Sequence, residues 1–180
     1  MTERPATYSG LQKLVHWITA LMVFTLVPVG VYMVRRGAAT DFDDLTGRLY
    51  TAHKTFGAVV LGLVVLRIVV RLTRGTPAPD PSLARIQVIA AEAVHGLIHL
   101  ALVAVPILGW LGVSAYGARE ILGGLSLPEI FAKNEATAKV LLGLHGWAAF
   151  GLAALVTAHF GAALIHRFVF KDGVMKRMLS

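Results

Sequence analysis

Four long apolar stretches separated by short polar segments dominate the sequence. They run from roughly Leu14 to Val34, Tyr50 to Leu72, Ile86 to Val113 and Ala138 to Phe168. A helix needs about 20 apolar residues to cross a hydrocarbon core of about 30 Å, and each stretch is long enough. The stretches are rich in Leu and Ala and lack period-two alternation, which argues against strands. The pattern predicts an all-α protein in which residues 1–180 form one domain, a four-helix transmembrane bundle.

The polar segments between these stretches predict the topology. Thr73–Ser82 is rich in proline and breaks a helix, Thr40–Asp44 is acidic, and Pro128 lies in the third connection. If each stretch crosses once, ten of the 17 Lys and Arg fall on the side of both termini and seven on the other. This bias predicts that both termini are cytoplasmic. The ten residues are Arg4, Lys13, Arg67, Arg71, Arg74, Arg85, Arg167, Lys171, Lys176 and Arg177.

Composition narrows the chemistry. Hydrophobic residues make up 56% of the chain and charged residues only 15%, against about 25% charged residues in soluble proteins. Cysteine is absent, which excludes disulfides, Cys-ligated iron–sulfur or zinc sites, Cys nucleophiles and covalent c-type haem. The seven histidines are therefore the remaining strong metal ligands. The net charge of +7 is explained by basic loops facing anionic membrane lipid, so nucleic acid is not an expected partner.

Histidines at membrane depth are the strongest chemical signal, because ionisable groups inside a bilayer are costly. His145 and His159 lie 14 residues apart in the fourth stretch, about 21 Å along a helix and on nearly the same face. His16 begins the first stretch at the depth of His159, and His53 begins the second at the depth of His145. The sequence predicts an inner pair, His16 with His159, and an outer pair, His53 with His145.

A haem iron between two imidazoles explains such pairs better than zinc does, because zinc normally takes three or four protein ligands. Small and apolar residues between His145 and His159 leave room for a flat macrocycle. Two stacked haems would suit electron transfer across the membrane. Four unrelated structural histidines are the alternative. His95 and His99 could form a zinc pair, replace a ligand, or hydrogen-bond a haem propionate, but a satisfied polar role is our first interpretation.

The ordered set of histidine segments resembles the bacterial cytochrome b561 family of small dihaem membrane proteins. The matching segments are LQKLVHWITA, YTAHKTFG, AVHGLIHLALVAVPILGW and LHGWAAFGLAALVTAHFGAALIHRFVFKD, the last ending in an H-x4-KD pattern. The resemblance implies b-type haem, a quinone partner and residence in the bacterial inner membrane. It also implies His16, His53, His145 and His159 as ligands. His99 departs from the family, which often has Tyr at that position.

Length and C-terminal pattern are most similar to the superoxide:ubiquinone oxidoreductase type within this family. That likeness implies electron flow from superoxide, as a periplasmic electron donor, to ubiquinone or another quinone. A membrane electron-carrier subunit of a larger respiratory oxidoreductase is the second hypothesis. A haem- or metal-handling membrane protein is the third.

Charged residues near the inner end are candidates to assist this chemistry. Arg67, Arg71 and Arg74 share one helix face and could hold haem propionates or quinone carbonyls. His166 could supply a proton and Lys171 could donate to a carbonyl, so a quinone site on the cytoplasmic side is a hypothesis. A basic membrane anchor is the alternative.

A second basic group is expected at the outer end, where it could steer a small anion or bind outer propionates. Its members are Arg35, Arg36, Arg48 and Lys54. Three aspartates in the acidic connection, Asp41, Asp43 and Asp44, oppose that steering.

Overall fold

A computed structural model describes residue 5 and residues 7–179. It contains four helices long and apolar enough to cross a membrane, and the described residues form no strand beyond one isolated bridge. The all-α prediction with four spans is therefore confirmed, while Arg4 lies outside the described residues. The elements are α1 (Gly10–Ala39), α2 (Asp44–Arg74), α3 (Arg85–Tyr116), η1 (Leu122–Gly124), α4 (Glu135–Ile165), the π-helical turn η2 (His166–Phe170) and α5 (Lys176–Leu179).

α1 begins at Gly10 rather than Leu14, α2 at Asp44 rather than Tyr50, and α4 at Glu135 rather than Ala138, because the residues that cap these helices lie outside the hydrophobic pattern. The Ser9 hydroxyl accepts from the Gln12 backbone N–H, and the Gln12 side chain accepts from the Ser9 N–H. This reciprocal capping box starts α1. Asp43 caps α2 and Asn134 caps α4, each through a side-chain oxygen that accepts one hydrogen bond from a backbone N–H of the first turn. The polar residues at the helix ends thus accept hydrogen bonds from first-turn backbone N–H groups, which have no partner within the helix.

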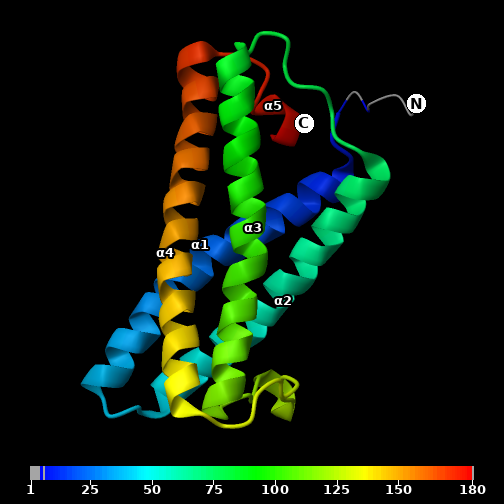
Figure 1. Ribbon diagram of the computed structural model, residues 1–180. Coiled ribbons are helices and arrows are strands. Elements are labelled where there is room, and N and C mark those ends of the chain that lie inside the picture. The colour runs from blue at the N-terminus through cyan, green and yellow to red at the C-terminus, as the bar shows by residue number, and fades with distance from the viewer. Residues whose placement is uncertain (1–4, 6, 180) are drawn as a thin grey trace.

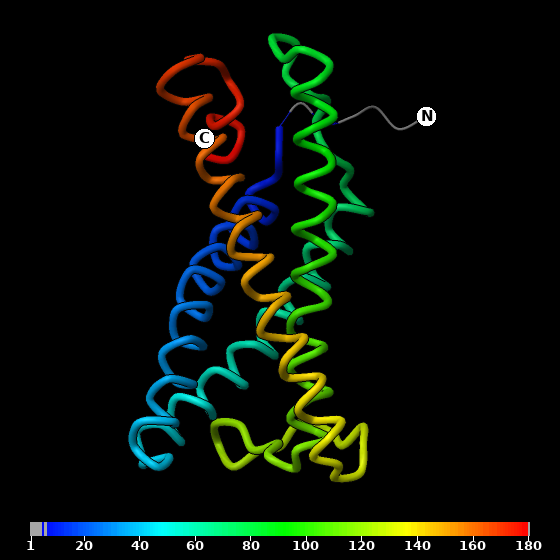
Figure 2. The backbone as a smooth tube through the Cα atoms, turned by 60° about the vertical axis from the view of Figure 1, so that its left-hand side comes forward, coloured from blue at the N-terminus to red at the C-terminus, as the bar shows by residue number. Residues whose placement is uncertain are grey.

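The helices pack as two pairs that cross (Figure 1). α3 lies along α4 and α1 along α2, whereas α1 and α4 make few close approaches. The start of α1 and the C-terminal α5 lie at one end of the bundle, as Figure 2 also shows. We call this end the terminal end, and the opposite end, which holds the α1–α2 and α3–α4 connections, the loop end.

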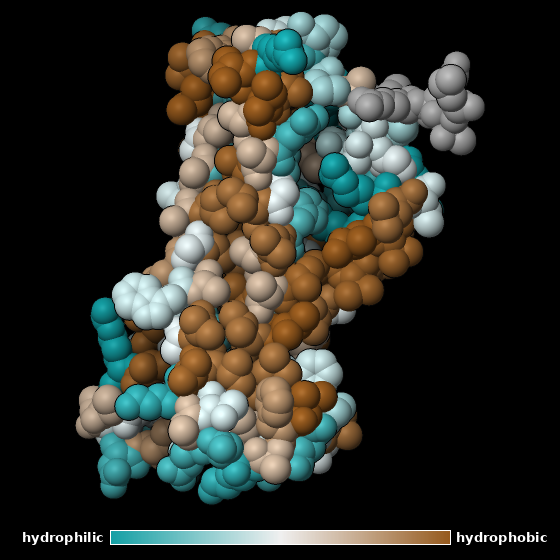
Figure 3. Space-filling model, in the orientation of Figure 1, coloured by the Kyte–Doolittle hydropathy of each residue, from teal (hydrophilic) through white to brown (hydrophobic). Residues whose placement is uncertain are grey.

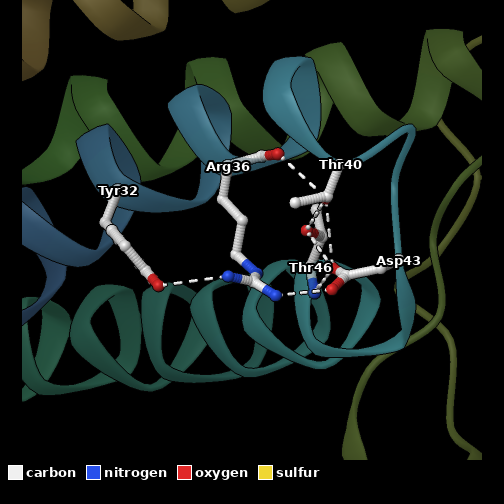
Figure 4. A network of polar contacts seen from close by, with 5 residues as sticks. All are labelled: Tyr32, Arg36, Thr40, Asp43 and Thr46. Carbon is white, nitrogen blue, oxygen red and sulfur yellow. Dashed lines mark hydrogen bonds and ion pairs between the residues drawn. The ribbon is translucent and has the colours of Figure 1, made fainter.

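A polar network closes the α1–α2 connection at the loop end (Figure 4). Arg36 Nη2 donates to Asp43 Oδ2 at 2.5 Å, and its Nη1 contacts the Tyr32 hydroxyl at 3.5 Å. Asp43 Oδ1 also accepts from the hydroxyl of Thr46, at 2.7 Å, and of Thr40, at 3.3 Å. The Arg36 and Thr46 hydrogen bonds lower the pKa of Asp43 well below its usual range. Asp43 therefore both starts α2 and fastens it to α1.

The best-packed part of the bundle lies at mid-depth. Val23, Val60, Val64, Leu102 and Leu152 are buried there, with one or more residues from each long helix. Around this layer the surface is apolar, and Figure 3 shows a broad hydrophobic band, with many polar residues at the lower end and a mixture of polar and hydrophobic residues at the upper end. Such a surface matches a bilayer with polar regions on each side. The apolar layer separates the two ends at which the histidines lie.

Candidate functional site

The loop-end pair, His53 of α2 and His145 of α4, faces across the bundle. The centres of the two imidazole rings lie 6.1 Å apart, and their planes are nearly perpendicular at 89°. The structure thus brings together the two residues that equal depth predicts to be neighbours. Their role as haem ligands stays a prediction.

A hydrogen bond fixes the orientation of His145. Its Nδ1 lies 2.8 Å from the carbonyl oxygen of Val105 in α3. A carbonyl only accepts, so Nδ1 carries the proton and Nε2 keeps its lone pair. Metal-binding histidines are usually held in this way, with the second nitrogen donating to a carbonyl or carboxylate. His145 is therefore oriented and in the correct tautomer to bind a metal through Nε2.

Glycines allow two helices to approach these rings. A Cβ atom at Gly30 of α1 would lie 3.1 Å from Cε1 of His53, and one at Gly109 of α3 would lie 3.0 Å from Nδ1 of His145. Both distances are shorter than an ordinary van der Waals contact of about 3.5–4.0 Å. The two rings can therefore occupy their observed positions only because Gly30 and Gly109 have no side chain.

A cavity of about 620 Å³ opens beside the loop-end pair. All four long helices line it, and its walls are almost entirely aliphatic apart from His53, His145, Tyr50, Trp147, Phe150 and Arg35. This volume falls in the range of about 300–1,000 Å³ that cofactor sites occupy. The sparse contact between α1 and α4 explains why space is left there.

The residues at the loop end fit a haem. Two imidazoles bound on opposite sides of one metal, with metal–nitrogen bonds of about 2.1 Å, would place their ring centres about 6.4 Å apart. The observed 6.1 Å is close to that value. In addition, Nδ1 of His53 is buried with no hydrogen-bond partner. Burying an unpaired nitrogen costs free energy, so a bound group with a polar part would be favoured beside it.

The terminal-end pair, His16 of α1 and His159 of α4, shows the same spacing. The ring centres lie 6.4 Å apart. Arg67 Nη1 lies 2.9 Å from Nδ1 of His16, and because a guanidinium only donates, Nδ1 is the acceptor. The spacing thus fits a metal between the rings, but the neutral His16 ring then carries its proton on Nε2. Arg67 therefore lies beside the inner pair, and its role toward a haem propionate or a quinone stays a prediction.

His95 and His99 of α3 join the terminal-end pair. The ring of His95 lies 5.0 Å from that of His159, too short for two ligands on opposite sides of one metal by the estimate above. His99 Nδ1 donates to the carbonyl of His95 at 2.6 Å, which leaves its buried Nε2 without a partner. The polar role is therefore only half satisfied. Among the described residues no group of three or more His, Cys, Asp or Glu is placed to hold a metal ion.

Beyond α4, His166 pairs with a residue to which sequence reasoning gave no role. Its Nδ1 lies 2.5 Å from Oδ2 of Asp172, and the two side chains are 16% and 11% exposed. Lys171 and Arg71, the predicted carbonyl donors, are both exposed. The H-x4-KD pattern contains Asp172, so the signal was present in the sequence, but the π-helical turn that folds it back onto His166 was not.

Three of the four basic residues predicted to form the outer group divide into two kinds. Arg36 is held by Asp43, and Lys54 Nζ donates to the carbonyl of Ala118 at 2.8 Å. Arg35 instead lines the cavity beside His53 and His145. Of these three, only Arg35 is therefore placed to face a group bound in the cavity.

The fold and these sites define a class of protein: a four-span membrane protein with two histidine pairs, one toward each membrane surface. The sequence matches the family described as prokaryotic cytochrome b561 over residues 7–180. The chain belongs to that family, whose members are membrane electron-transfer proteins, and the family implies b-type haem.

Relatives with assigned names cover nearly the whole chain. Cytochrome b561 homolog 2 of Escherichia coli K12 is 30% identical over 99% of this chain and 94% of its own length. A probable superoxide oxidase, CybB, of Yersinia pestis is 28% identical over 96% of this chain and 95% of its own. Cytochrome b562 of Cereibacter sphaeroides is 29% identical over 99% and 98%. The similarity therefore extends over all four spans.

Proposed function

We propose that this protein is a dihaem b-type cytochrome of the bacterial inner membrane that passes electrons from an outer donor to a quinone. The observation that carries the proposal is the repeated spacing of two histidine pairs, 6.1 Å at the loop end and 6.4 Å at the terminal end. When bound, b-type haem would supply one-electron redox chemistry at iron. His53 and His145 would hold one group, and His16 and His159 the other.

The rest of the chain would set distance and environment. About 21 Å of α4 separates His145 from His159, and the apolar layer around Val64 and Leu152 fills the space between the two pairs. His145 is oriented by Val105, and Arg67 contributes a positive charge beside His16. The chain thus provides two positions for one-electron carriers in one membrane-spanning protein.

Superoxide is the donor that we propose, and the support is the name of the Yersinia pestis relative, a probable superoxide oxidase. The cavity at the loop end agrees with a donor that approaches from outside, since Arg35 lies in its wall. The basic excess at the terminal end supports a cytoplasmic position for that end. A quinone is proposed to bind there, near His166, Lys171 and Arg71.

Haem analysis of the purified protein and of its histidine variants tests the assignment of two haems to the two histidine pairs. Pyridine haemochrome analysis of the purified protein should give two haems per chain, and about one per chain contradicts the two-pair assignment. His53→Ala and His145→Ala should each remove one haem and leave the spectrum of the other. His16→Ala and His159→Ala should remove the complementary one. His95→Ala is the matched control and should keep both.

The reaction is tested in lipid nanodiscs. Superoxide from xanthine and xanthine oxidase should drive quinol formation that depends on the protein and is abolished in His53→Ala. If superoxide yields no quinol while the protein co-purifies with a catalytic subunit, the chain is an electron-carrier subunit and superoxide is not its donor.

A further inference from the structure

The terminal end contains a histidine–carboxylate pair, neither member of which is among the four proposed haem ligands. His166 Nδ1 faces Asp172 Oδ2 at 2.5 Å across the π-helical turn that follows α4. Asp172 is itself held, because its Oδ1 accepts from the Val174 backbone N–H at 3.1 Å. Lys171 adopts a left-handed backbone conformation, φ 54°, which turns the chain so that Asp172 comes back to His166. The pair is thus built by a specific local fold rather than by chance on a flexible tail.

The segment after this turn is fastened to the rest of the bundle. Asp80 approaches Gly173 so closely that a Cβ at that position would lie 2.8 Å from Oδ2 of Asp80. Asp80 also faces Arg177, with an N–O distance of 3.9 Å, and Trp17 Nε1 of α1 donates to the carbonyl of Met178 at 3.0 Å. The loop between α2 and α3 and the start of α1 therefore hold the His166–Asp172 turn over the terminal end.

The direction of the hydrogen bond defines what the pair can do. A carboxylate accepts the Nδ1 proton and fixes the tautomer, so Nε2 becomes the nitrogen that can exchange a proton with a bound molecule. When the ring carries both protons, Nδ1–H stays bound to the carboxylate and Nε2–H is the proton that can be given up, as in a catalytic triad. Since both side chains are largely buried, the carboxylate is poorly screened by water.

We propose that Asp172 is a positioning residue for proton transfer, holding His166 so that Nε2 delivers a proton to a quinone bound at the terminal end. This inference rests on the proposed function. A quinone becomes a quinol by taking up two electrons and two protons, and two b-type haems, if held by the four proposed ligands, would supply the two electrons. The Nε2–H bond of the doubly protonated His166 ring breaks as one O–H bond of the quinol forms, and the neutral ring keeps its Nδ1 proton toward Asp172. Water on the terminal side reprotonates the imidazole and supplies the second proton.

The test separates proton-coupled from simple electron transfer. Holoprotein in nanodiscs is reduced with stoichiometric dithionite, and haem reoxidation is followed by stopped flow with either a short-chain ubiquinone or ferricyanide, which takes an electron but no proton. Asp172→Asn should slow reoxidation by quinone about 10- to 100-fold, by analogy with the cost of removing the hydrogen-bond partner of a metal-binding histidine. Reoxidation by ferricyanide, both haem spectra and the quinone concentration for half-maximal rate should be unchanged.

Two further measurements distinguish chemistry from loss of structure. The solvent deuterium isotope effect on the quinone reaction should rise in Asp172→Asn, because proton delivery becomes rate-limiting, and Asp172→Glu should recover part of the rate. Asp80→Asn is the matched control, since it removes a carboxylate that holds the same segment but leaves the His166–Asp172 contact. It should retain the quinone rate of the original protein.

The outcomes that overturn the proposal are distinct from those that overturn the function. If His166→Ala slows the quinone reaction and Asp172→Asn does not, Asp172 has no positioning role, and the terminal quinone site stands. If Asp172→Asn slows quinone and ferricyanide equally, its role is structural and the proposal is wrong. If neither variant changes the quinone rate, quinone binds elsewhere, and the proposed function loses its terminal-end site as well.

Discussion

Gly109→Ala is the sharpest test of the loop-end pair, because the added methyl group meets the His145 ring directly. The new Cβ would lie 3.0 Å from Nδ1 and 3.1 Å from Cε1, several tenths of an ångström inside an ordinary contact of about 3.5–4.0 Å. Nδ1 also donates to the Val105 carbonyl at 2.8 Å. The ring cannot move away from α3 without lengthening that bond, so the substitution displaces the ring and weakens its orientation together.

The expected magnitude follows from these two effects. Overpacking of a filled site costs about 1–3 kcal/mol, and a weakened hydrogen bond adds up to about 1 kcal/mol. A loss of about 2 kcal/mol in the affinity of the loop-end site for haem corresponds to roughly a 30-fold change. Alanine also favours a helix over glycine by about 1 kcal/mol, which stabilises the fold and works against detection by thermal unfolding.

The control variant cancels that helix effect. Gly96→Ala adds the same methyl group to α3, but its Cβ would have no atom within 4 Å. Haem content by pyridine haemochrome, and the rate of haem transfer to excess apomyoglobin, are compared between the two variants. Gly109→Ala should lose one haem faster than Gly96→Ala and keep the other. Equal content and equal transfer rates would show that the His145 ring does not carry the loop-end haem in this position.

Three other predictions address the terminal end, the polar network and the helix interface. Arg67→Gln removes a positive charge beside His16, which stabilises oxidised haem there by on the order of 1–2 kcal/mol. The midpoint potential of the terminal-end haem should therefore fall by roughly 40–90 mV in a redox titration. Asp43→Asn should destabilise the protein above pH 4, and the difference in thermal unfolding should shrink as pH falls below the unfolded pKa of about 3.9, because the pKa of Asp43 is lowered in the fold. Gly112→Ala would place a Cβ 2.6 Å from Leu142 Cδ2 and should lower the unfolding free energy by about 1–3 kcal/mol, measured by denaturant titration.

The hydrophobic pattern contains most of the fold because the membrane imposes one length and one secondary structure on each span. Depth along each span then places His16 level with His159 and His53 level with His145. Helix ends were predicted less well. Asp43 and Ser9 are polar, so an apolar count stops before them, although their capping bonds are what begin α2 and α1.

Contacts that depend on how helices cross could not be read from the chain. Nothing in the spacing of Val105 or Gly109 indicates that α3 turns a carbonyl and a bare backbone toward His145. The pairing of His166 with Asp172 requires a π-helical turn and a left-handed Lys171, neither of which has a periodic signature. The segment was recognisable as a motif, but its geometry was not.

The two histidine pairs also differ in a way that depth conceals. At the loop end a carbonyl takes the Nδ1 proton of His145, so Nε2 is free to bind a metal without further change. At the terminal end Arg67 donates to Nδ1 of His16, so Nε2 of the neutral ring holds the proton. A metal at that nitrogen requires the proton to leave or Arg67 to turn aside, and the nearby His99 has a buried Nε2 that can accept a hydrogen bond from the displaced guanidinium. The rings of the two pairs are similarly spaced, but only His145 already has the tautomer that binds a metal through Nε2. The hydrogen bond from Arg67 is the reason that His16 does not.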